Sequence, residues 1–281
     1  MSSVKETNPK TTYLFKAKTQ EAYQIKILAE LLTNNLKTGC FEVTENGVTL
    51  RMMDHHRKTL IDLNLPAENF GLYRFTAEEK MYLGLNLTHF HKMLKSIKKK
   101  DSLQLYIDSA APRDLAIKAI PKENTRIMTS FVKIQTIQNL DVDVPTGYGR
   151  NVIVSSGEFQ KMLKDMMNIG QTIQVTAQDF HIKFTCTAGG VYHRQVEFGE
   201  NENDDESNEP KGQLYDQEFA TEQLARITKI AGLGSTMQIF PAENLPLLFR
   251  SNVGNLGKVN IYIKSKAQIE QENVSADSDS D

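Results

Sequence analysis

The chain has 281 residues, of which 40% are hydrophobic and 24% are charged. At about 150 residues per domain, this length predicts two domains and a sizeable buried core. Because no run of about 18 apolar residues occurs and residues 1–10 are polar, we expect neither a membrane-spanning helix nor a secretory signal. Cys40 and Cys186 are the only cysteines, so the sequence indicates neither a disulfide framework nor a zinc site.

The net charge of −2 conceals an uneven distribution of charge along the chain. Residues 199–212 and 270–281 together hold eleven acids and one base, so the rest of the chain carries a net charge of +8. Such a basic body favours a polyanionic partner. Residues 199–212 have no large apolar side chain, so we expect an acidic surface loop there. We expect residues 1–12 and 270–281 to be disordered.

Strand-like runs with period-two alternation dominate the chain. Gly39–Val43 and Val48–Met52 flank an Asn-Gly pair that favours a hairpin turn. Further strands are expected at Thr59–Leu65, Leu103–Asp108, Leu115–Ile120, Thr125–Ile134, Asn151–Val154, Ile173–Thr176, His181–Thr185, Tyr192–Phe198, Thr236–Phe240, Leu247–Ser251 and Lys258–Ile263. Helical periodicity is confined to about Gln20–Asn35, Thr88–Lys98, Gly157–Asn168 and Thr221–Ala231. Many strands and four helices predict an α+β fold with mostly antiparallel sheets.

The order of strands and helices repeats after roughly 135 residues, which is far longer than a solenoid repeat and indicates a duplicated domain. The halves are joined by a segment that contains Pro145, Gly147 and Gly149. We therefore place domain 1 at 13–137, an inter-domain connector at 138–150 and domain 2 at 151–269.

Three of the four predicted helices carry a basic face opposite an apolar stripe. The basic residues are Lys92, Lys95 and Lys99 on the second helix, Lys161 and Lys164 on the third, and Arg226 and Lys229 on the fourth. The first helix has a weaker polar face, where we place Lys26, Ile27 and Glu30. Such faces are often only the solvated side of an amphipathic helix. Lysines without interleaved aromatics also suit phosphate contacts that ignore base sequence and weaken with salt. On the residues alone, both interpretations stand.

Motifs for catalysis or metal binding are incomplete. His89 and His91 are two residues apart and so do not share a helical face, and no third ligand follows at a zinc-like spacing. Lys258 follows a glycine-containing segment, but the spacing of a phosphate-binding loop and its Ser or Thr are absent. We expect no enzymatic activity, no metal and no cofactor.

Four short motifs occur in an order and spacing that resemble one family. They are GVTLRMMD at 47–54, GLNLT at 84–88, LDVDVP at 140–145 and SGEF at 156–159. The chain resembles the proliferating cell nuclear antigen family of DNA sliding clamps from about Tyr13 to Lys266.

The resemblance implies a head-to-tail trimeric ring of two similar clamp domains per chain, with antiparallel sheets outside and four helices inside. Duplex DNA would pass through the hole without sequence-specific contacts, and a DNA polymerase and a clamp loader would bind the ring. The chain would act in DNA replication and repair as a polymerase processivity factor, in the nucleus. Lys26, Lys92, Lys95, Lys161, Lys164 and Lys229 match basic inner-wall positions of the family.

The resemblance also implies two protein-binding sites. Strand 125–134 of one subunit would pair with strand 192–198 of the next, with contacts from Thr125, Met128, Phe131, Tyr192, Val196 and Phe198. Proteins with short clamp-binding peptides would enter a pocket under the connector, lined by Met53, Val142, Val144, Pro145, Pro246, Tyr262 and Ile263. Methionine suits a pocket with many partners because its side chain is adaptable.

Some residues depart from the family pattern. Glu222 stands where a base is usual on the fourth helix, Ile27 replaces a common lysine, and residues 199–212 look like an insertion. These departures suggest a divergent lineage such as a large DNA virus, for which a cytoplasmic replication site is an alternative. Two other functions are also open: a subunit of a heterotrimeric checkpoint clamp, or a monomeric viral processivity factor.

Overall fold

The computed structural model describes residues 12–123, 126–138, 142–199 and 214–278. The first half contains β1 (Tyr13–Thr19), α1 (Ala22–Asn35), β2 (Thr38–Thr44), β3 (Gly47–Met53), β4 (Thr59–Pro66), η1 (Ala67–Asn69), β5 (Leu72–Phe75), β6 (Met81–Asn86), α2 (Leu87–Leu94), β7 (Ser102–Asp108), β8 (Asp114–Ile120) and β9 (Met128–Lys133). The second half contains β10 (Val152–Ser155), α3 (Ser156–Met166), β11 (Thr172–Gln178), β12 (His181–Ala188), β13 (Tyr192–Phe198), β14 (Tyr215–Ala220), α4 (Thr221–Ala225), η2 (Thr228–Gly232), β15 (Thr236–Phe240), β16 (Leu247–Asn252), β17 (Lys258–Ile263) and α5 (Lys266–Ser278).

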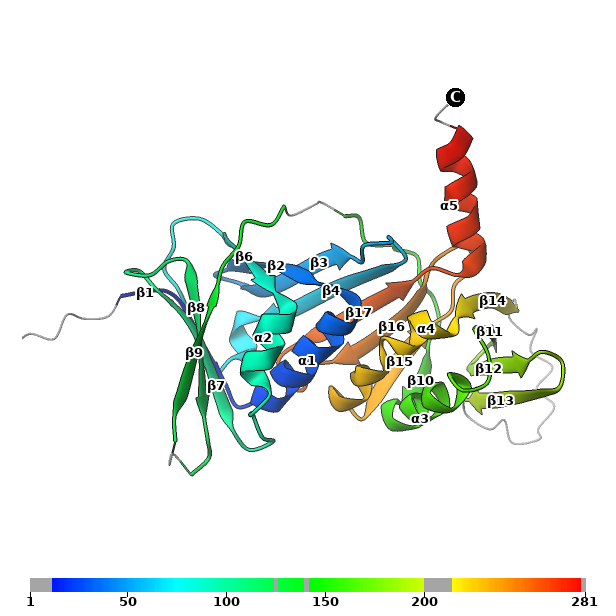
Figure 1. The fold of residues 1–281 in the computed structure, drawn as a ribbon, viewed down its shortest axis with the longest axis horizontal. Helices are drawn as coiled ribbons and strands as arrows, with labels where there is room; N and C mark the ends of the chain where they lie inside the picture. Colours follow the sequence, from blue (N-terminus) through cyan, green and yellow to red (C-terminus); the bar gives the residue numbers. More distant parts are fainter. Residues whose placement is uncertain (1–11, 124–125, 139–141, 200–213, 279–281) are drawn as a thin grey trace, which may run out of the picture.

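The strands form three antiparallel sheets, which agrees with the expected α+β class. A five-stranded sheet has the order β5-β1-β7-β8-β9, and a four-stranded sheet has the order β13-β12-β11-β14. Between them lies an eight-stranded central sheet, β10-β15-β16-β17-β4-β3-β2-β6, to which both halves of the chain contribute. Figure 1 shows α1, α2, α3 and α4 in front of these sheets, with β9 and β13 toward opposite ends of the molecule.

The sheet orders make the duplication explicit. The run β1-β7-β8-β9 corresponds to β10-β15-β16-β17, and the run β4-β3-β2-β6 corresponds to β13-β12-β11-β14. The halves meet where β17 pairs antiparallel with β4, from Lys258 opposite Asn64 to Ile263 opposite Thr59. By this correspondence, β9 is the counterpart of β17, and β13 is the counterpart of β4.

The main core lies between the helices and the sheets. Alternate strand residues such as Ile61, Ile239 and Ile261 are fully buried there, together with Phe159 of α3. Burial of such apolar area, at about 25 cal/mol per Å², is the main favourable contribution to folding.

Ile27 corrects one sequence-based expectation. We placed it on the polar face of the first helix, but it is buried. A Cβ atom on Gly232 of η2 would lie 2.9 Å from Ile27 Cγ2. The two halves therefore also meet through α1 and η2, and this contact buries Ile27.

The fourth helix is shorter than its periodicity predicts. We expected one helix at Thr221–Ala231, whereas α4 ends at Ala225 and the 3₁₀ helix η2 follows from Thr228. The Thr228 hydroxyl donates a hydrogen bond to the Ala225 carbonyl (2.9 Å) and so occupies an acceptor at the end of α4.

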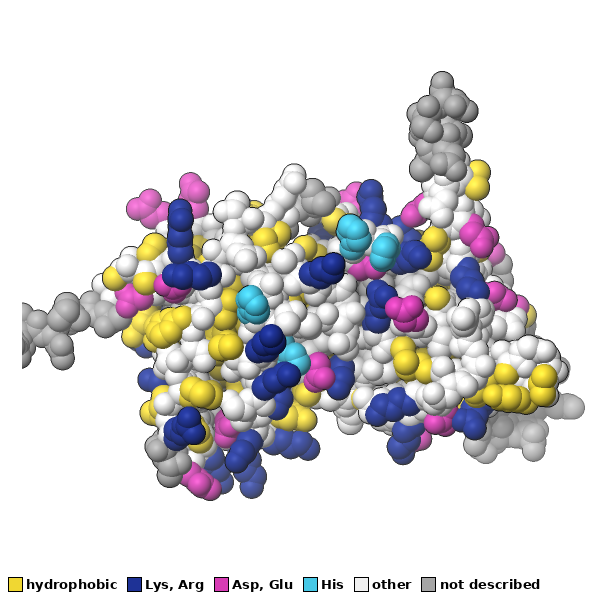
Figure 2. Space-filling model, in the orientation of Figure 1, with side chains coloured by type: hydrophobic (Ala, Val, Ile, Leu, Met, Phe, Trp, Pro, Cys, Tyr) yellow, Lys and Arg dark blue, Asp and Glu magenta, His cyan; other side chains and the backbone are white. Residues whose placement is uncertain are grey.

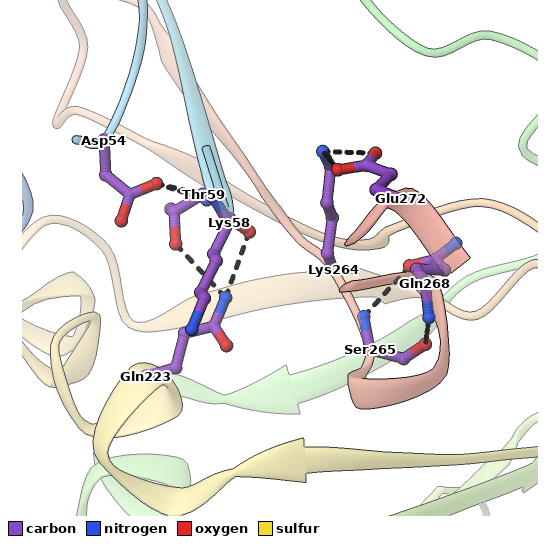
Figure 3. Close-up of polar contacts among 8 residues, drawn as sticks. All are labelled: Asp54, Lys58, Thr59, Gln223, Lys264, Ser265, Gln268 and Glu272. Carbon is purple, nitrogen blue, oxygen red and sulfur yellow. Dashed lines mark hydrogen bonds and ion pairs between the residues drawn. The ribbon is translucent and has the colours of Figure 1, made fainter. Parts of the chain in front are cut away.

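The C-terminal segment differs from the expectation of disorder over 270–281, because α5 continues to Ser278. Its start has a capping box, in which the Gln268 N–H donates to Ser265 Oγ (3.3 Å) and the Ser265 N–H donates to Gln268 Oε1 (2.9 Å). Lys264 Nζ contacts the Glu272 carboxylate at 2.6 Å (Figure 3). The expectations for residues 1–11 and for the acidic segment 200–213 lie outside the described residues. No helix of the described part is long and apolar enough to cross a membrane.

We expect Ser265→Ala to loosen the first turn of α5, because it removes the acceptor for the Gln268 N–H. Loss of an N-cap costs about 1 kcal/mol, which corresponds to roughly fivefold faster amide exchange in that turn. Hydrogen exchange measured by NMR checks this. Gln268→Glu keeps an acceptor for the Ser265 N–H and should retain protection, whereas unchanged exchange in Ser265→Ala would refute the capping role.

Candidate functional sites

Caps and packing fix how the helices are oriented, so that each helix turns one face to solvent. The Asn86 side chain accepts a hydrogen bond from the His89 N–H at the start of α2 (2.9 Å), and Ser155 does the same for the Glu158 N–H of α3 (3.4 Å). The apolar stripes of these helices are buried in the main core. Their opposite sides are therefore turned away from the sheets, and Figure 2 shows Lys and Arg side chains spread across that face.

Four of the eight predicted DNA-binding residues are held by neighbours on this face. Lys26 Nζ donates to the carbonyls of Lys95 (2.8 Å) and Ile97 (2.9 Å), and so covers the C-terminal end of α2. The others form ion pairs, which are Lys161 with Glu158 (2.7 Å), Arg226 with Glu222 (2.6 Å) and Lys229 with Glu30 (2.7 Å). Hydrogen bonding to Glu158 raises the pKa of Lys161, and hydrogen bonding to Arg226 lowers the pKa of Glu222.

The other four predicted residues are exposed. Lys92, Lys95 and Lys164 make no ion pair with any part of the chain that the structure describes. The Lys99 ammonium lies 5.7 Å from the centre of the Tyr23 ring, within range of a cation–π contact. These four predicted residues are therefore available to an external anion.

Sequence reasoning missed His91 as part of this face. It lies near Glu30, Lys26, Lys95 and Lys229, and burial is the main cause that lowers its pKa. At neutral pH, His91 therefore adds no positive charge, and the basic character of the face comes from lysine and arginine.

A second apolar cluster lies on the face of the central sheet opposite the helices. We call it the connector cluster, and its buried members are Leu60, Phe240, Leu248 and Tyr262, with Met53, Val142, Val144 and Tyr148 packed against them. Four of the predicted pocket residues, Met53, Val142, Val144 and Tyr262, thus come together.

Tyr148 ties the connector to this cluster. Its ring centre is 5.9 Å from that of Tyr262 and 6.3 Å from that of Phe240. Its hydroxyl donates to the Pro246 carbonyl at 2.7 Å, which brings the predicted Pro246 to the edge of the cluster. Burial raises the pKa of both Tyr148 and Tyr262, so both rings stay neutral. Pro145 is half-buried in the connector.

Ile263 does not belong to this pocket. It is fully buried in the main core, on the helix side of the sheet. Side chains alternate across a strand, so Tyr262 and Ile263 face opposite sides of β17. The same alternation could have identified Leu60 as a pocket residue. Its neighbour Ile61 faces the main core, so Leu60 faces the opposite side of the sheet. Phe240 and Leu248 come from strands that the resemblance did not connect with the pocket.

The predicted subunit contacts lie on two edge strands. Within the described sheets, β9 and β13 are each paired on one side only. Phe131 on β9 is 63% exposed and Tyr192 on β13 is 55% exposed, while Met128 is half-buried. Val196 and Phe198 are half-buried against the main core. Thr125 lies outside the described residues.

The described residues contain no group of three or more His, Cys, Asp or Glu side chains that could hold a metal ion. Asp54 instead stabilises the turn that follows it: one of its carboxylate oxygens accepts hydrogen bonds from the backbone N–H groups of Lys58 (2.7 Å) and Thr59 (2.8 Å). Gln223 of α4 donates to the Lys58 carbonyl (3.0 Å), which links this turn to the second half of the chain (Figure 3).

Comparison with known proteins agrees with these features. The family model of the proliferating cell nuclear antigen N-terminal domain matches residues 14–144, and that of the C-terminal domain matches residues 144–273. A curated relative, proliferating cell nuclear antigen of Chaetomium thermophilum, is 24% identical over 258 residues, which cover 90% of this chain and 98% of the relative.

The two family models together span nearly all of the described chain, from β1 into α5. Members of this family are non-enzymatic clamps that act in DNA replication and repair. The chain therefore belongs to the proliferating cell nuclear antigen family and is a DNA sliding clamp.

Proposed function

We propose that three copies of this chain form a closed head-to-tail ring around duplex DNA. The observation that carries the proposal is the correspondence between the β17–β4 junction and the two free edges. Inside the chain, β17 and β4 pair antiparallel over six residue pairs. Their counterparts β9 and β13 lie unpaired on one side at opposite ends of the molecule, so a second copy can repeat the junction (Figure 1).

The strand registers place specific residues opposite one another at this boundary. Leu247 of β16 pairs with Ile263 of β17, and Leu115 of the matching strand β8 pairs with Val132 of β9. Ile263 and Val132 therefore occupy matching positions. Leu65 of β4 pairs with Val48 of β3, and Phe198 of β13 pairs with Ile182 of β12. Because Val48 and Ile182 occupy matching positions in β3 and β12, Leu65 and Phe198 match as well. Transfer of the β17–β4 register then sets Met128 opposite Val196 and Phe131 opposite His193 of the next subunit.

A head-to-tail contact uses two different surfaces and forms a ring only when the rotation between copies closes. Each subunit supplies two similar domains, so three copies would give six domains around the hole. Edge strands that stay open would be exposed to uncontrolled association. Ring closure would pair every β9 with a β13.

The helix face would line the hole and contact DNA phosphates. A clamp must hold DNA without stopping, so few contacts of moderate strength are preferable to many strong ones. The four cations held by Glu158, Glu222, Glu30 and the carbonyls at the end of α2 reduce the number of free charges. Lys92, Lys95, Lys99 and Lys164 would make the principal phosphate contacts.

The connector cluster would receive short peptides of partner proteins. Its members are apolar and aromatic, with the half-buried Met53, Val142 and Val144 at its surface. An aromatic or aliphatic side chain of a peptide would bury the apolar surface that these residues leave exposed, and this burial would favour binding. A DNA polymerase and a clamp loader would use this site, and we propose a nuclear location.

We expect wild-type protein to sediment as a homotrimer at micromolar concentration. Phe131→Asp should produce monomers, because it places a carboxylate at an apolar strand boundary. Ile153→Asp is a matched control, since Ile153 is 66% exposed on β10, outside the proposed boundary. A wild-type monomer would instead favour a monomeric processivity factor or a subunit that needs two different partners.

For the DNA contacts, we expect Lys92→Glu with Lys164→Glu to weaken duplex binding about tenfold or more at low salt and to flatten its salt dependence. Lys118→Glu with Lys258→Glu is the matched control. Both residues lie on strand positions that alternate with main-core residues and face away from the helices. Fluorescence anisotropy over a salt series checks this, and equal effects of the two pairs would refute the assignment of the helix face.

For the partner site, Met53→Ala with Val142→Ala should weaken binding of a peptide with aromatic and aliphatic anchors by about tenfold, because apolar contact area is lost. Calorimetry with a synthetic peptide measures this, and sedimentation should show an intact ring. Ile153→Ala removes exposed apolar area elsewhere and should bind normally. Undiminished affinity in the double variant would contradict the pocket.

A further inference from the structure

A row of polar side chains crosses the central sheet next to the connector cluster. We call it the polar row, and it takes one residue from each of four neighbouring strands (Figure 1), namely Arg51 of β3, Asp62 of β4, Asn260 of β17 and Arg250 of β16. Two positions along the same strands lie the cluster members Met53, Leu60, Tyr262 and Leu248. Side chains two residues apart share a face of a sheet. The polar row therefore borders the connector cluster, on the face that is turned away from the helices.

Side-chain hydrogen bonds connect the members of the polar row. Arg51 Nε donates to Asp62 Oδ1 (3.2 Å), and Asn260 Nδ2 donates to Asp62 Oδ2 (3.2 Å). Arg250 Nε donates to Asn260 Oδ1 at 2.8 Å. The row thus holds two cations and one anion, and the charge that balances Asp62 comes from Arg51.

Arg250 is held in place but has no acidic partner. Its guanidinium carbon lies 4.7 Å from the centre of the Phe240 ring, which belongs to the connector cluster. Its neighbour across the sheet in β15 is the uncharged Gln238. Its terminal Nη atoms have no ion pair and no hydrogen bond among the residues that the structure describes. Arg250 is also half-buried, so its charge is less screened by salt than that of a fully exposed arginine.

The charges of the polar row act on the connector cluster. Burial is the main cause that raises the pKa of Tyr262, and Asp62 raises it further, whereas Arg250 and Arg51 lower it. Both guanidinium groups are therefore close enough to the Tyr262 hydroxyl to influence its ionisation. A peptide on the cluster would lie within the same electrostatic field.

We propose that Arg250 binds the carboxylate of an aspartate or glutamate in the partner peptide, while the apolar anchors of that peptide occupy the connector cluster. The proposal rests on the partner site proposed above and names the chemistry of its ligand. The free Nη atoms offer the planar fork that suits a carboxylate. Because Phe240 and Asn260 already hold Arg250, little side-chain entropy is lost when the peptide binds. Arg250 thus selects peptides with an acidic residue beside their apolar anchors.

Other charged groups near the cluster are less suited to this role. Arg51 is paired with Asp62, and Lys264, which follows Tyr262 by two residues, is paired with Glu272 at 2.6 Å. Asp143 of the connector is exposed and forms no ion pair in the described part of the chain, so it does not neutralise Arg250. DNA on the helix face would lie across the sheet from Arg250. The ligand that Arg250 can reach is therefore a partner on the connector side.

Calorimetry on the full chain with a set of synthetic peptides tests this role. The parent peptide has one aromatic and one aliphatic anchor and neutral side chains elsewhere, and each further peptide replaces one neutral residue by Glu. We expect at least one Glu peptide to bind wild-type protein about fivefold more tightly than the parent at low salt, the upper range for one partly exposed ion pair. Arg250→Gln should abolish this gain. Arg250→Lys should restore only part of it, because lysine lacks the planar fork.

The readout is the ratio of the two affinities in each variant, which a merely structural loss would leave unchanged. Lys258→Gln is the matched control, because it removes an exposed cation from the same face of β17, farther from the cluster, and should keep the gain. Circular dichroism melting checks that each variant is folded.

The possible results separate Arg250 from the pocket itself. The assignment of Arg250 is overturned, and the pocket is kept, if no Glu position strengthens binding to wild-type protein or if the gain persists in Arg250→Gln. An equal loss of affinity for all peptides in Arg250→Gln assigns it a structural role and also overturns the proposal. A parent peptide that does not bind wild-type protein, or that binds the Met53→Ala and Val142→Ala double variant undiminished, overturns the pocket and Arg250 together.

Discussion

Six residue pairs between β17 and β4 turn two half-chains into one continuous sheet. The ladder satisfies backbone groups that would otherwise form two open edges in the middle of the molecule. Because each half has the same strand order, closing this pair of edges leaves the equivalent pair, β9 and β13, open at the two ends. The contact that builds the subunit thus also specifies how a second subunit can join it. Gln223 and the α1–η2 contact add side-chain support to the junction, so the helices of both halves are held on one face.

Strand alternation in the same sheet separates the two proposed functional sites. Residues such as Ile61, Ile261 and Ile263 point to the helix side and form the main core, while Leu60 and Tyr262 point to the other side and form the connector cluster. The proposed DNA contacts and the proposed partner contacts therefore lie on opposite faces, one layer of backbone apart. Tyr148 holds the connector over the second face through its ring contacts and its bond to the Pro246 carbonyl. A partner at the cluster would not obstruct the helix face.

Sequence patterns predicted the helices and strands whose periodicity is strong. They failed where contacts between distant parts of the chain determine the local structure. Most strands and the amphipathic helices α2 and α3 follow from alternation and from their caps, as at Asn86. The short β5 and β14 lack a clear pattern and take their place from neighbouring strands. Ile27 was misplaced because its partner Gly232 is distant in sequence. Composition suggested disorder after Glu270, but a capping box at Ser265 and the Lys264–Glu272 pair support α5. Family resemblance named the pocket region, and only strand alternation shows that Ile263 faces away from it.

Charge explains how a chain with a net charge of −2 can act on DNA. The basic residues of the helix face are only partly free, since Glu30, Glu158 and Glu222 each hold one of them. If the helix face lines the hole as proposed, this pairing would limit the phosphate contacts to a few lysines, and few contacts allow movement along DNA.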